Sequence, residues 1–285
     1  RRQRQMCIRD STGIAWDHVN VFPTETSYIR QFEMYLATVQ MNGIVIHCME
    51  DDTLNTVVSR IKSSRPDIQW VGYATPSHTP TTHGSIVTFE DGTSLSLDLL
   101  GAHNMQNLAA ARACFRAMGY TTNEFDKHMR DFTGAARRLE IIHEDVARNF
   151  VAFRDFAHAP SKLRATQASV VNQFPNRKVT AVFELHTYSS LSKSFIPQYS
   201  EAMNEVDHAI VYFDPSVVQH KRLEELSPEF VKDSFARDNL EVFTKTNDLK
   251  RRLSKVPSEN HVLLMMSSGR FGGVIFNPAP RPATS

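Results

Sequence analysis

Apolar strand-like runs alternate with helix-like stretches throughout the second half of the chain. Strands are expected near residues 139–142, 150–153, 178–183, 208–213, 240–243 and 261–266, and helices near 161–172, 195–204, 227–236 and 246–255. Alternation of this kind predicts an α/β domain in which helices cover a mostly parallel sheet. Ligands bind such sheets where strands end and loops begin, so we expect a site in these loops.

The first half of the chain predicts a second α/β unit. Helices are expected at residues 26–39, 53–63, 103–118 and 122–132, and strands at 44–48, 69–73, 85–89 and 94–99. Residues 75–83 are rich in Pro, Ser and Thr and are expected to form a loop. The helical pattern breaks at residues 133–136, so the predicted domains cover residues 11–134 and 135–285.

Residues 1–10 show no periodicity of either kind. They resemble a sequencing adapter read as protein, and we expect them to be a non-native leader. On this interpretation the natural chain resumes near Ser11 and is truncated upstream.

Composition limits the classes of partner. The 285 residues carry a formal net charge of +1, which gives no support for nucleic-acid or membrane-surface binding. No apolar run approaches the roughly 20 residues that span a bilayer, and there is no signal peptide. Cys7, Cys48 and Cys114 form no disulfide framework, so we expect a cytoplasmic protein, and no protein partner is evident.

A strand, a glycine turn and a helix start follow one another at residues 94–118. Asn104 and Asn107 are three residues apart and should share one face of the first helical turn. Carboxamides both donate and accept hydrogen bonds, which suits the recognition of a base edge. The alternative is that one Asn only caps the helix.

Two shorter motifs carry charge. Asp17 and His18 could serve a divalent cation near phosphates, although a histidine in a loop can also be purely structural. Arg137 and Arg138 lie at the domain junction and could place a fixed positive fork on phosphate or a purine edge. The alternative is a solvated pair or a salt bridge to Glu140.

The loop at residues 154–162 follows a strand and opens a helix. An aspartate in the position of Asp155 can accept both hydroxyls of a ribose. Phe156 could stack on a base, and His158 could approach phosphate. The alternative is that Pro160 begins the helix and Asp155 merely caps it.

In this order and at these spacings, the four loops resemble motifs of the Mur ligases, the ATP-dependent amide-bond ligases of peptidoglycan assembly. The family motifs DH, GxHNxxN, RR[LF]E and DDFAHHP correspond to residues 17–18, 101–107, 137–140 and 154–160. Residues 14–22, 181–190 and 265–273 add to the likeness, which covers essentially everything after Ser11. The resemblance implies an α/β fold: the C-terminal part of a central ATPase domain, then a Rossmann-like domain that swings about residues 133–136.

The resemblance also implies roles for individual residues. ATP would be bound by Asn104, Asn107, Arg138, Asp155, Phe156 and His158; the incoming amino acid or peptide by His186, Ser267, Ser268 and Arg270; and Mg²⁺ by His18. Two positions depart from the family pattern. Arg154 replaces the first Asp of the DDFAHHP motif, and Ala159 replaces its second His.

The phosphate-binding loop of the family, which should lie well upstream of Asp17, is absent from the chain. The acidic metal ligand that follows it and the UDP-binding domain are absent as well. Phosphoryl transfer depends on such a loop, so we expect this chain to be a catalytically inactive fragment of an active enzyme.

The stretches at residues 184–190 and 271–273 favour the peptide-adding members of the family. The predicted function is therefore a ligase of peptidoglycan recycling that joins UDP-N-acetylmuramate to a murein tripeptide through an acyl phosphate. The alternatives are a ligase that adds L-alanine to UDP-N-acetylmuramate, another Mur ligase, and a non-catalytic nucleotide-binding module. A dinucleotide oxidoreductase is disfavoured because no G-x-G-x-x-G follows a strand.

Overall fold

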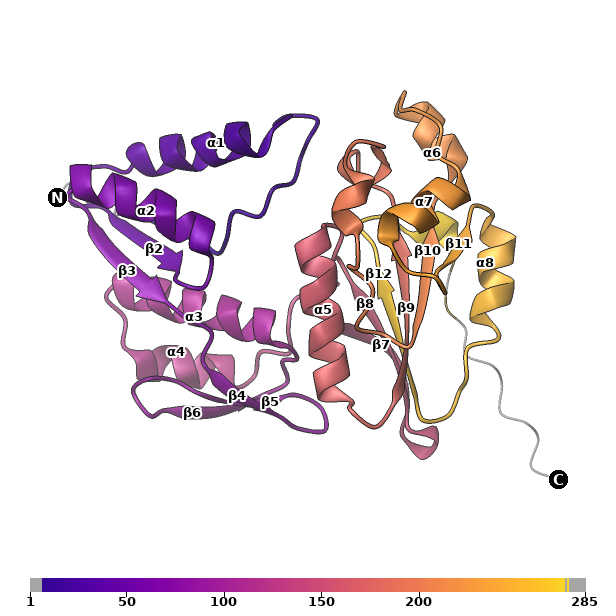
Figure 1. Ribbon diagram of the computed structural model, residues 1–285. Helices are drawn as coiled ribbons and strands as arrows, with labels where there is room; N and C mark the ends of the chain where they lie inside the picture. Colours follow the sequence, from indigo (N-terminus) through magenta and orange to yellow (C-terminus); the bar gives the residue numbers. More distant parts are fainter. Residues whose placement is uncertain (1–6, 275, 277–285) are drawn as a thin grey trace. The chain divides into compact units, whose positions relative to one another are not determined.

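The computed structural model describes residues 7–274 and residue 276, and it divides into two compact units between Thr133 and Gly134. This division lies one residue before the predicted domain boundary. Each unit is an α/β structure with its own sheet and its own apolar core (Figure 1). The expected fold class, with a mostly parallel sheet in the second half, is confirmed.

Unit 1 contains a parallel sheet of order β1-β2-β3. Its strands are β1 (Ile8–Ser11), β2 (Ile44–Cys48) and β3 (Gln69–Tyr73), and its helices are α1 (Glu25–Ala37), α2 (Asp52–Ser64), α3 (Ala102–Ala117) and α4 (Thr122–Met129). Figure 1 shows α1 and α2 on one side of the sheet and α3 on the other. Because both faces are covered, β2 is an almost fully buried apolar run.

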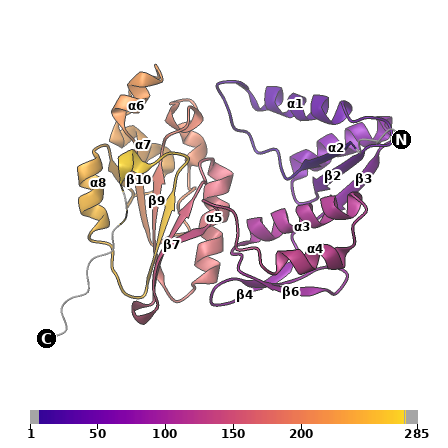
Figure 2. The ribbon, with the colours of Figure 1, turned by 180° about the vertical axis from the view of Figure 1, so that it is seen from behind.

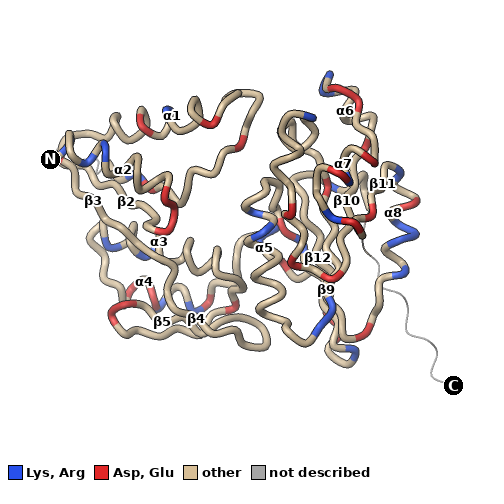
Figure 3. Tube along the Cα trace, in the orientation of Figure 1, with Lys and Arg blue, Asp and Glu red and all other residues tan. Residues whose placement is uncertain are grey.

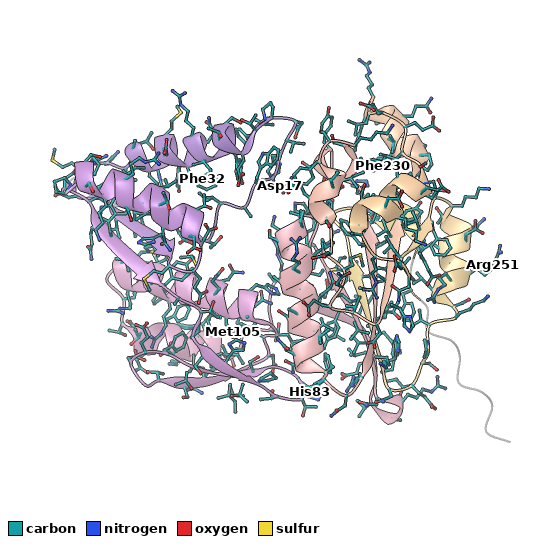
Figure 4. All side chains as sticks on the ribbon, viewed as in Figure 1. Asp17, Phe32, His83, Met105, Phe230 and Arg251 are labelled. Atoms are coloured by element: carbon teal, nitrogen blue, oxygen red, sulfur yellow. The ribbon has the colours of Figure 1, made fainter. Side chains whose placement is uncertain are left out.

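An antiparallel sheet of order β4-β5-β6 completes unit 1. Its strands are β4 (Ser77–Pro80), β5 (Ser85–Thr88) and β6 (Ser94–Leu97), and the last two form the predicted hairpin. Inward residues alternate with exposed ones along both hairpin strands, and they pack on α3 and α4. Met105 of α3, labelled in Figure 4, is fully buried in this cluster.

Two strands of unit 1 were not predicted. Ile8–Ser11 pairs in parallel with β2, although residues 1–10 show no periodicity and were expected to be a non-native leader. Ser77–Pro80 forms an edge strand within the predicted loop. Proline is tolerated at an edge because its missing N–H faces no neighbouring strand, so a Pro-rich stretch can still pair on one side.

Unit 2 contains a six-stranded sheet of order β11-β10-β9-β12-β8-β7. Its strands are β7 (Glu140–Asp145), β8 (Phe150–Asp155), β9 (Lys178–Glu184), β10 (His208–Tyr212), β11 (Glu241–Phe243) and β12 (His261–Met266). All neighbours are parallel except β7 and β8. The last strand, β12, lies between β8 and β9, and all six of its residues are buried.

Helices cover both faces of the unit 2 sheet. They are α5 (Pro160–Gln173), α6 (Pro215–His220), α7 (Pro228–Phe235) and α8 (Thr246–Leu253). Figures 1 and 2, seen from opposite sides, show α5 and α8 on opposite faces. Acidic and basic residues are interspersed along both units, apart from a basic last turn in α8 (Figure 3). Basic side chains are favourable at a helix C-terminus because they complement its partial negative charge.

The second unit departs from the predicted elements in two places. The helix expected at residues 195–204 is only a short 3₁₀ turn, Ile196–Tyr199, with Pro197 within it. The short helix α6 was not predicted; Asp214 caps it, and Pro215 is its first residue.

Candidate functional site

The carboxyl ends of three neighbouring strands bring the main motifs of unit 2 together. Met266, the last residue of β12, is in register with Asp155 at the end of β8 and with Phe183 of β9. The loops that follow these strands therefore begin side by side at one edge of the sheet. This is the edge at which α/β sheets bind their ligands.

Asp155 is buried, with 2% of its surface exposed. One carboxylate oxygen accepts a hydrogen bond from the Leu139 N–H at 2.9 Å. The other accepts from the Ala157 N–H at 2.7 Å and from the Thr166 hydroxyl at 3.2 Å. In this structure the carboxylate thus ties the junction segment to the start of α5. Its predicted ribose contact remains a prediction.

The two arginines of the junction have different environments. Arg137 donates from its guanidinium to the carbonyls of Ser267 at 3.0 Å and Gly269 at 2.8 Å, so it anchors the loop after β12. Arg138 is exposed, and its guanidinium carbon lies 5.6 Å from the centre of the Phe156 ring. Of the pair, Arg138 is therefore the one whose charge is presented to solvent.

Phe156 is half-buried, with the Arg137 guanidinium carbon 4.8 Å from its ring centre. The ring of His158 meets that of Phe156 edge-on, with centroids 5.2 Å apart. His158 is 9% exposed, and its Nδ1 lies 2.9 Å from the Phe156 carbonyl. The structure thus groups Arg138, Phe156 and His158, while the predicted phosphate contact of His158 remains a prediction.

Arg154, which departs from the family motif, has a partner of opposite charge on the neighbouring strand. Arg154 is in register with Glu140 across β7 and β8, and the two side chains form a salt bridge of 3.1 Å. The Arg137 N–H also donates to Glu140 at 2.9 Å and, with Arg154, holds the pKa of that carboxyl below its usual range. The salt bridge to Glu140 that was the alternative role of Arg137 and Arg138 is therefore formed by Arg154 instead.

The four residues predicted to hold the acceptor lie in the loops after β9 and β12. Ser267 is buried, Ser268 and His186 are half-buried, and Arg270 is exposed. The Ser268 hydroxyl is buried without a hydrogen-bond partner among residues 7–274 and 276.

The sequence did not single out Glu184, the last residue of β9, which is 4% exposed. Its carboxylate accepts from the Ser267 hydroxyl and from the Phe271 N–H at 2.8 Å. The available signal was an acid directly after the apolar run of residues 181–183.

The predicted amide pair in unit 1 does not cap its helix. The N-cap of α3 is Gly101, with φ +85° and no side-chain cap bond. Asn104 donates to the Leu100 carbonyl at 2.8 Å, which leaves its amide oxygen for other partners. Asn107 is exposed on the next turn. The helix start therefore presents both carboxamides, and their contact with a nucleotide remains a prediction.

The predicted metal ligand lies in the loop between β1 and α1, next to Asp17, which is labelled in Figure 4. His18 is exposed with φ +57°, and its N–H donates to the Asp17 carboxylate at 2.7 Å. No group of three His, Cys, Asp or Glu side chains that could hold a metal occurs among the described residues. Mg²⁺ prefers several oxygen ligands, so these residues do not fit a magnesium site by themselves.

Unit 1 also contains a groove of about 760 Å³ between β3, α3 and the β5–β6 hairpin. None of the predicted site residues lines it. The buried cation in its wall, Arg112, forms ion pairs of 2.9 Å with Asp91 and with Asp126. The two carboxylates neutralise Arg112, so it adds no net positive charge to the groove.

No helix within the described part of the chain is both long and apolar enough to cross a bilayer.

In comparisons with known proteins, residues 137–269 match the family described as "Mur ligase, glutamate ligase domain". Over 275 residues the chain is 29% identical to a UDP-N-acetylmuramate–L-alanine ligase from Gloeobacter violaceus, covering 93% of this chain and 57% of that protein. Among solved structures, the MurF ligase of Thermotoga maritima in complex with ADP is similar (TM-score 0.69, 16% identity, 93% of this chain and 59% of that chain). A murein peptide ligase from Psychrobacter arcticus is also similar (TM-score 0.59, 15% identity, 93% and 55%). The chain thus spans a little over half the length of these relatives.

Proposed function

We propose that this chain is part of a Mur ligase, an enzyme that uses ATP to join an amine to the carboxyl group of UDP-N-acetylmuramate. The observation that carries the proposal is the meeting of three segments at one sheet edge: residues 137–140, 155–158 and 267–271. All three begin within the stretch that matches the ligase domain family. The three free cysteines agree with a cytoplasmic enzyme.

The proposed chemistry has two steps. The carboxylate of UDP-N-acetylmuramate attacks the γ-phosphorus of ATP, which gives an acyl phosphate and ADP. The amine of the acceptor then attacks the acyl carbon and loses its proton, and phosphate leaves from the tetrahedral intermediate. Both steps concentrate negative charge, so they need fixed positive charge rather than a protein nucleophile. Arg138, exposed beside Phe156, is the cation of unit 2 that we assign to the nucleotide.

We assign the acceptor to the loops that carry His186, Ser268 and Arg270. L-alanine is the first candidate acceptor, because the matched relatives include ligases named for it. The murein tripeptide is the second candidate, favoured by the sequence of residues 184–190 and 271–273. We propose ATP and Mg²⁺ as cofactors, but no step is assigned to the metal because the described residues do not form a site for it.

The test is an assay of the product of the complete reading frame that encodes this sequence. We expect ATP-dependent release of phosphate with UDP-N-acetylmuramate, and a product whose mass equals that of the two substrates less one water. L-alanine and L-alanyl-γ-D-glutamyl-meso-diaminopimelate are compared as acceptors. Nucleotide binding without any amide product would instead support a non-catalytic nucleotide-binding module.

A matched pair of variants tests the assigned cation. Arg138→Ala should weaken ATP binding by about tenfold or more, since one charge-assisted contact contributes roughly 1.5–3 kcal/mol. Arg251→Ala removes an exposed arginine from α8 of the same unit (Figure 4) and should leave binding unchanged. Equal loss in both variants would show that only overall charge matters.

A further inference from the structure

The loop after β12 is wrapped around one buried carboxylate. Glu184 accepts from the Ser267 hydroxyl and from the Phe271 N–H at 2.8 Å. The Ser267 hydroxyl oxygen in turn accepts from the Gly269 N–H at 2.7 Å. A single acid at the end of β9 therefore fixes both ends of the segment 267–271.

The backbone of this segment is strained where Glu184 holds it. Phe271 has φ +50°, and Gly272 and Gly273 follow with φ +60° and +82°. Phe271 is a buried, bulky residue in the left-handed region, where a non-glycine residue costs on the order of 1–2 kcal/mol. Such strain persists only where surrounding contacts enforce it, and the bond from the Phe271 N–H to Glu184 is one such contact.

The same carboxylate lies against the loop after β9. A Cβ on Gly269 would lie 2.7 Å from a Glu184 oxygen and 2.7 Å from the Cγ of His186, so the backbone of the loop rests directly on both side chains. The other Glu184 oxygen is 3.8 Å from the His186 Nδ1. Glu184 thus touches both segments that carry the residues we assign to the acceptor.

Arg137 holds the opposite side of the loop through the carbonyls of Ser267 and Gly269. Glu184 therefore accepts hydrogen bonds from an N–H and a hydroxyl group of the segment, and Arg137 donates hydrogen bonds to two of its carbonyls. This arrangement presets the loop before any ligand arrives.

We propose that Glu184 is the positioning residue of the acceptor site: it holds residues 267–271 and His186 in the arrangement that binds the acceptor amine compound. This inference rests on the proposed function. Glu184 touches no reacting atom in this role, and its effect passes through the loop and the imidazole.

The experiment compares Glu184→Gln with Asp207→Asn. Both loop bonds are accepted by the same Glu184 oxygen, so a glutamine with its amide oxygen in that place keeps both, but each bond then goes to a neutral acceptor and is weaker. Asp207 is the matched control: its carboxylate also accepts a backbone N–H, from Val179 at 2.8 Å, and forms a salt bridge with Lys178. Asp207 directly precedes β10 and bonds to the start of β9, whereas Glu184 lies at the end of β9.

The first measurement is amide hydrogen exchange on the 285-residue chain without substrates. In Glu184→Gln, the amide of Phe271 should exchange roughly 5- to 10-fold faster, the difference expected between a bond to a charged acceptor and one to a neutral acceptor. The amide of Gly269, which is held through the Ser267 hydroxyl, should change in the same direction. Asp207→Asn should leave these amides unchanged. Unchanged exchange in Glu184→Gln, or equal acceleration in both variants, would overturn the proposal.

The second measurement is steady-state kinetics in the enzyme assayed above. With L-alanine as the probe, Glu184→Gln should raise the acceptor KM roughly 5- to 10-fold and leave the KM for ATP unchanged. Ser267→Ala removes the bond to Glu184 and the bond from the Gly269 N–H but keeps the bond from the Phe271 N–H, and it should also raise the acceptor KM alone. A rise in both KM values, or in neither, contradicts a positioning role. If no ligase activity exists, the proposed function fails, and the exchange result alone decides whether Glu184 holds the loop.

Discussion

Replacing Asp155 with asparagine should destabilise unit 2 even in the absence of nucleotide. The carboxylate accepts hydrogen bonds from two backbone N–H groups and one hydroxyl, and it is almost completely buried. An asparagine that keeps its oxygen toward Ala157 and Thr166 must turn its NH₂ group toward the Leu139 N–H. One charge-assisted bond is then lost, and a buried donor is left without an acceptor.

The expected cost follows from these contacts. A hydrogen bond to a charged group contributes roughly 1.5–3 kcal/mol, and the remaining bonds weaken when the charge is removed. We therefore expect a loss of about 2–4 kcal/mol in the free energy of unfolding of unit 2. This corresponds to roughly 30- to 1,000-fold faster global hydrogen exchange, since each 1.4 kcal/mol is a factor of ten.

The assay is hydrogen exchange measured on peptides from β9 and β12. Asp214→Asn is the control, because Asp214 caps α6 with bonds to Ser216 and asparagine is an equally good cap. A carboxylate kept only for a ribose would be neutral to stability without nucleotide. If Asp155→Asn matched the wild type in these peptides, the structural role derived from its three bonds would be wrong.

Three further predictions concern stability. Arg112→Met should lower the free energy of unfolding of unit 1 by about 3–5 kcal/mol, because it leaves the buried carboxylate of Asp126 unpaired. Urea unfolding followed by tryptophan fluorescence measures the stability of this unit. The control is Arg116→Ala, which removes an exposed arginine. Burial lowers the pKa of His261 to about 4, below its ordinary 6.5, so the folded state excludes a proton that the unfolded state binds. Stability of unit 2 should therefore be full above pH 6.5 and fall by up to about 3 kcal/mol toward pH 4, and His261→Gln should flatten this dependence in acid unfolding curves. Gly272→Ala should destabilise unit 2 by about 1–2 kcal/mol because of its positive φ. A steric cost adds to this, because the new methyl group would lie 2.8–2.9 Å from two side-chain oxygens. Gly92→Ala, at a positive φ with open space around it, should show the conformational cost alone in thermal unfolding.

The fold was most predictable where a strand forms a short run of mainly apolar residues. The strands at residues 44–48, 69–73 and 261–266 were predicted with the bounds that the structure shows, because their runs of β-branched, aromatic or other apolar residues are bounded by turn signals. The strands β1 and β4 lie at sheet edges, where one side needs no partner and the sequence carries little apolar signal. Their pairing depends on neighbours distant in sequence.

The candidate site was predictable in position but less so in the roles of its residues. Several of the motifs lie at strand ends, as expected, since strand ends and glycine turns are local features; that these residues bind a ligand stays a prediction. Other features of the site depend on hydrogen-bond partners up to 132 residues away along the chain. These features are the bonds that Asp155 accepts, the different environments of Arg137 and Arg138, and the contacts of the buried Glu184. No local pattern encodes such contacts. The peptide acceptor expected from the sequence is not confirmed, because several of the similar proteins are named UDP-N-acetylmuramate–L-alanine ligases.

The place of β12 in the sheet constrains how this protein is made. The last strand of unit 2 among the described residues, His261–Met266, fills the gap between β8 and β9. Until it emerges from the exit tunnel, those two strands have no common neighbour, and the backbone N–H and C=O groups along their facing edges have no strand to pair with. The sheet of unit 2 therefore cannot be completed during synthesis before residue 266 has emerged, and a nascent protein stalled before residue 261 should depend on chaperones.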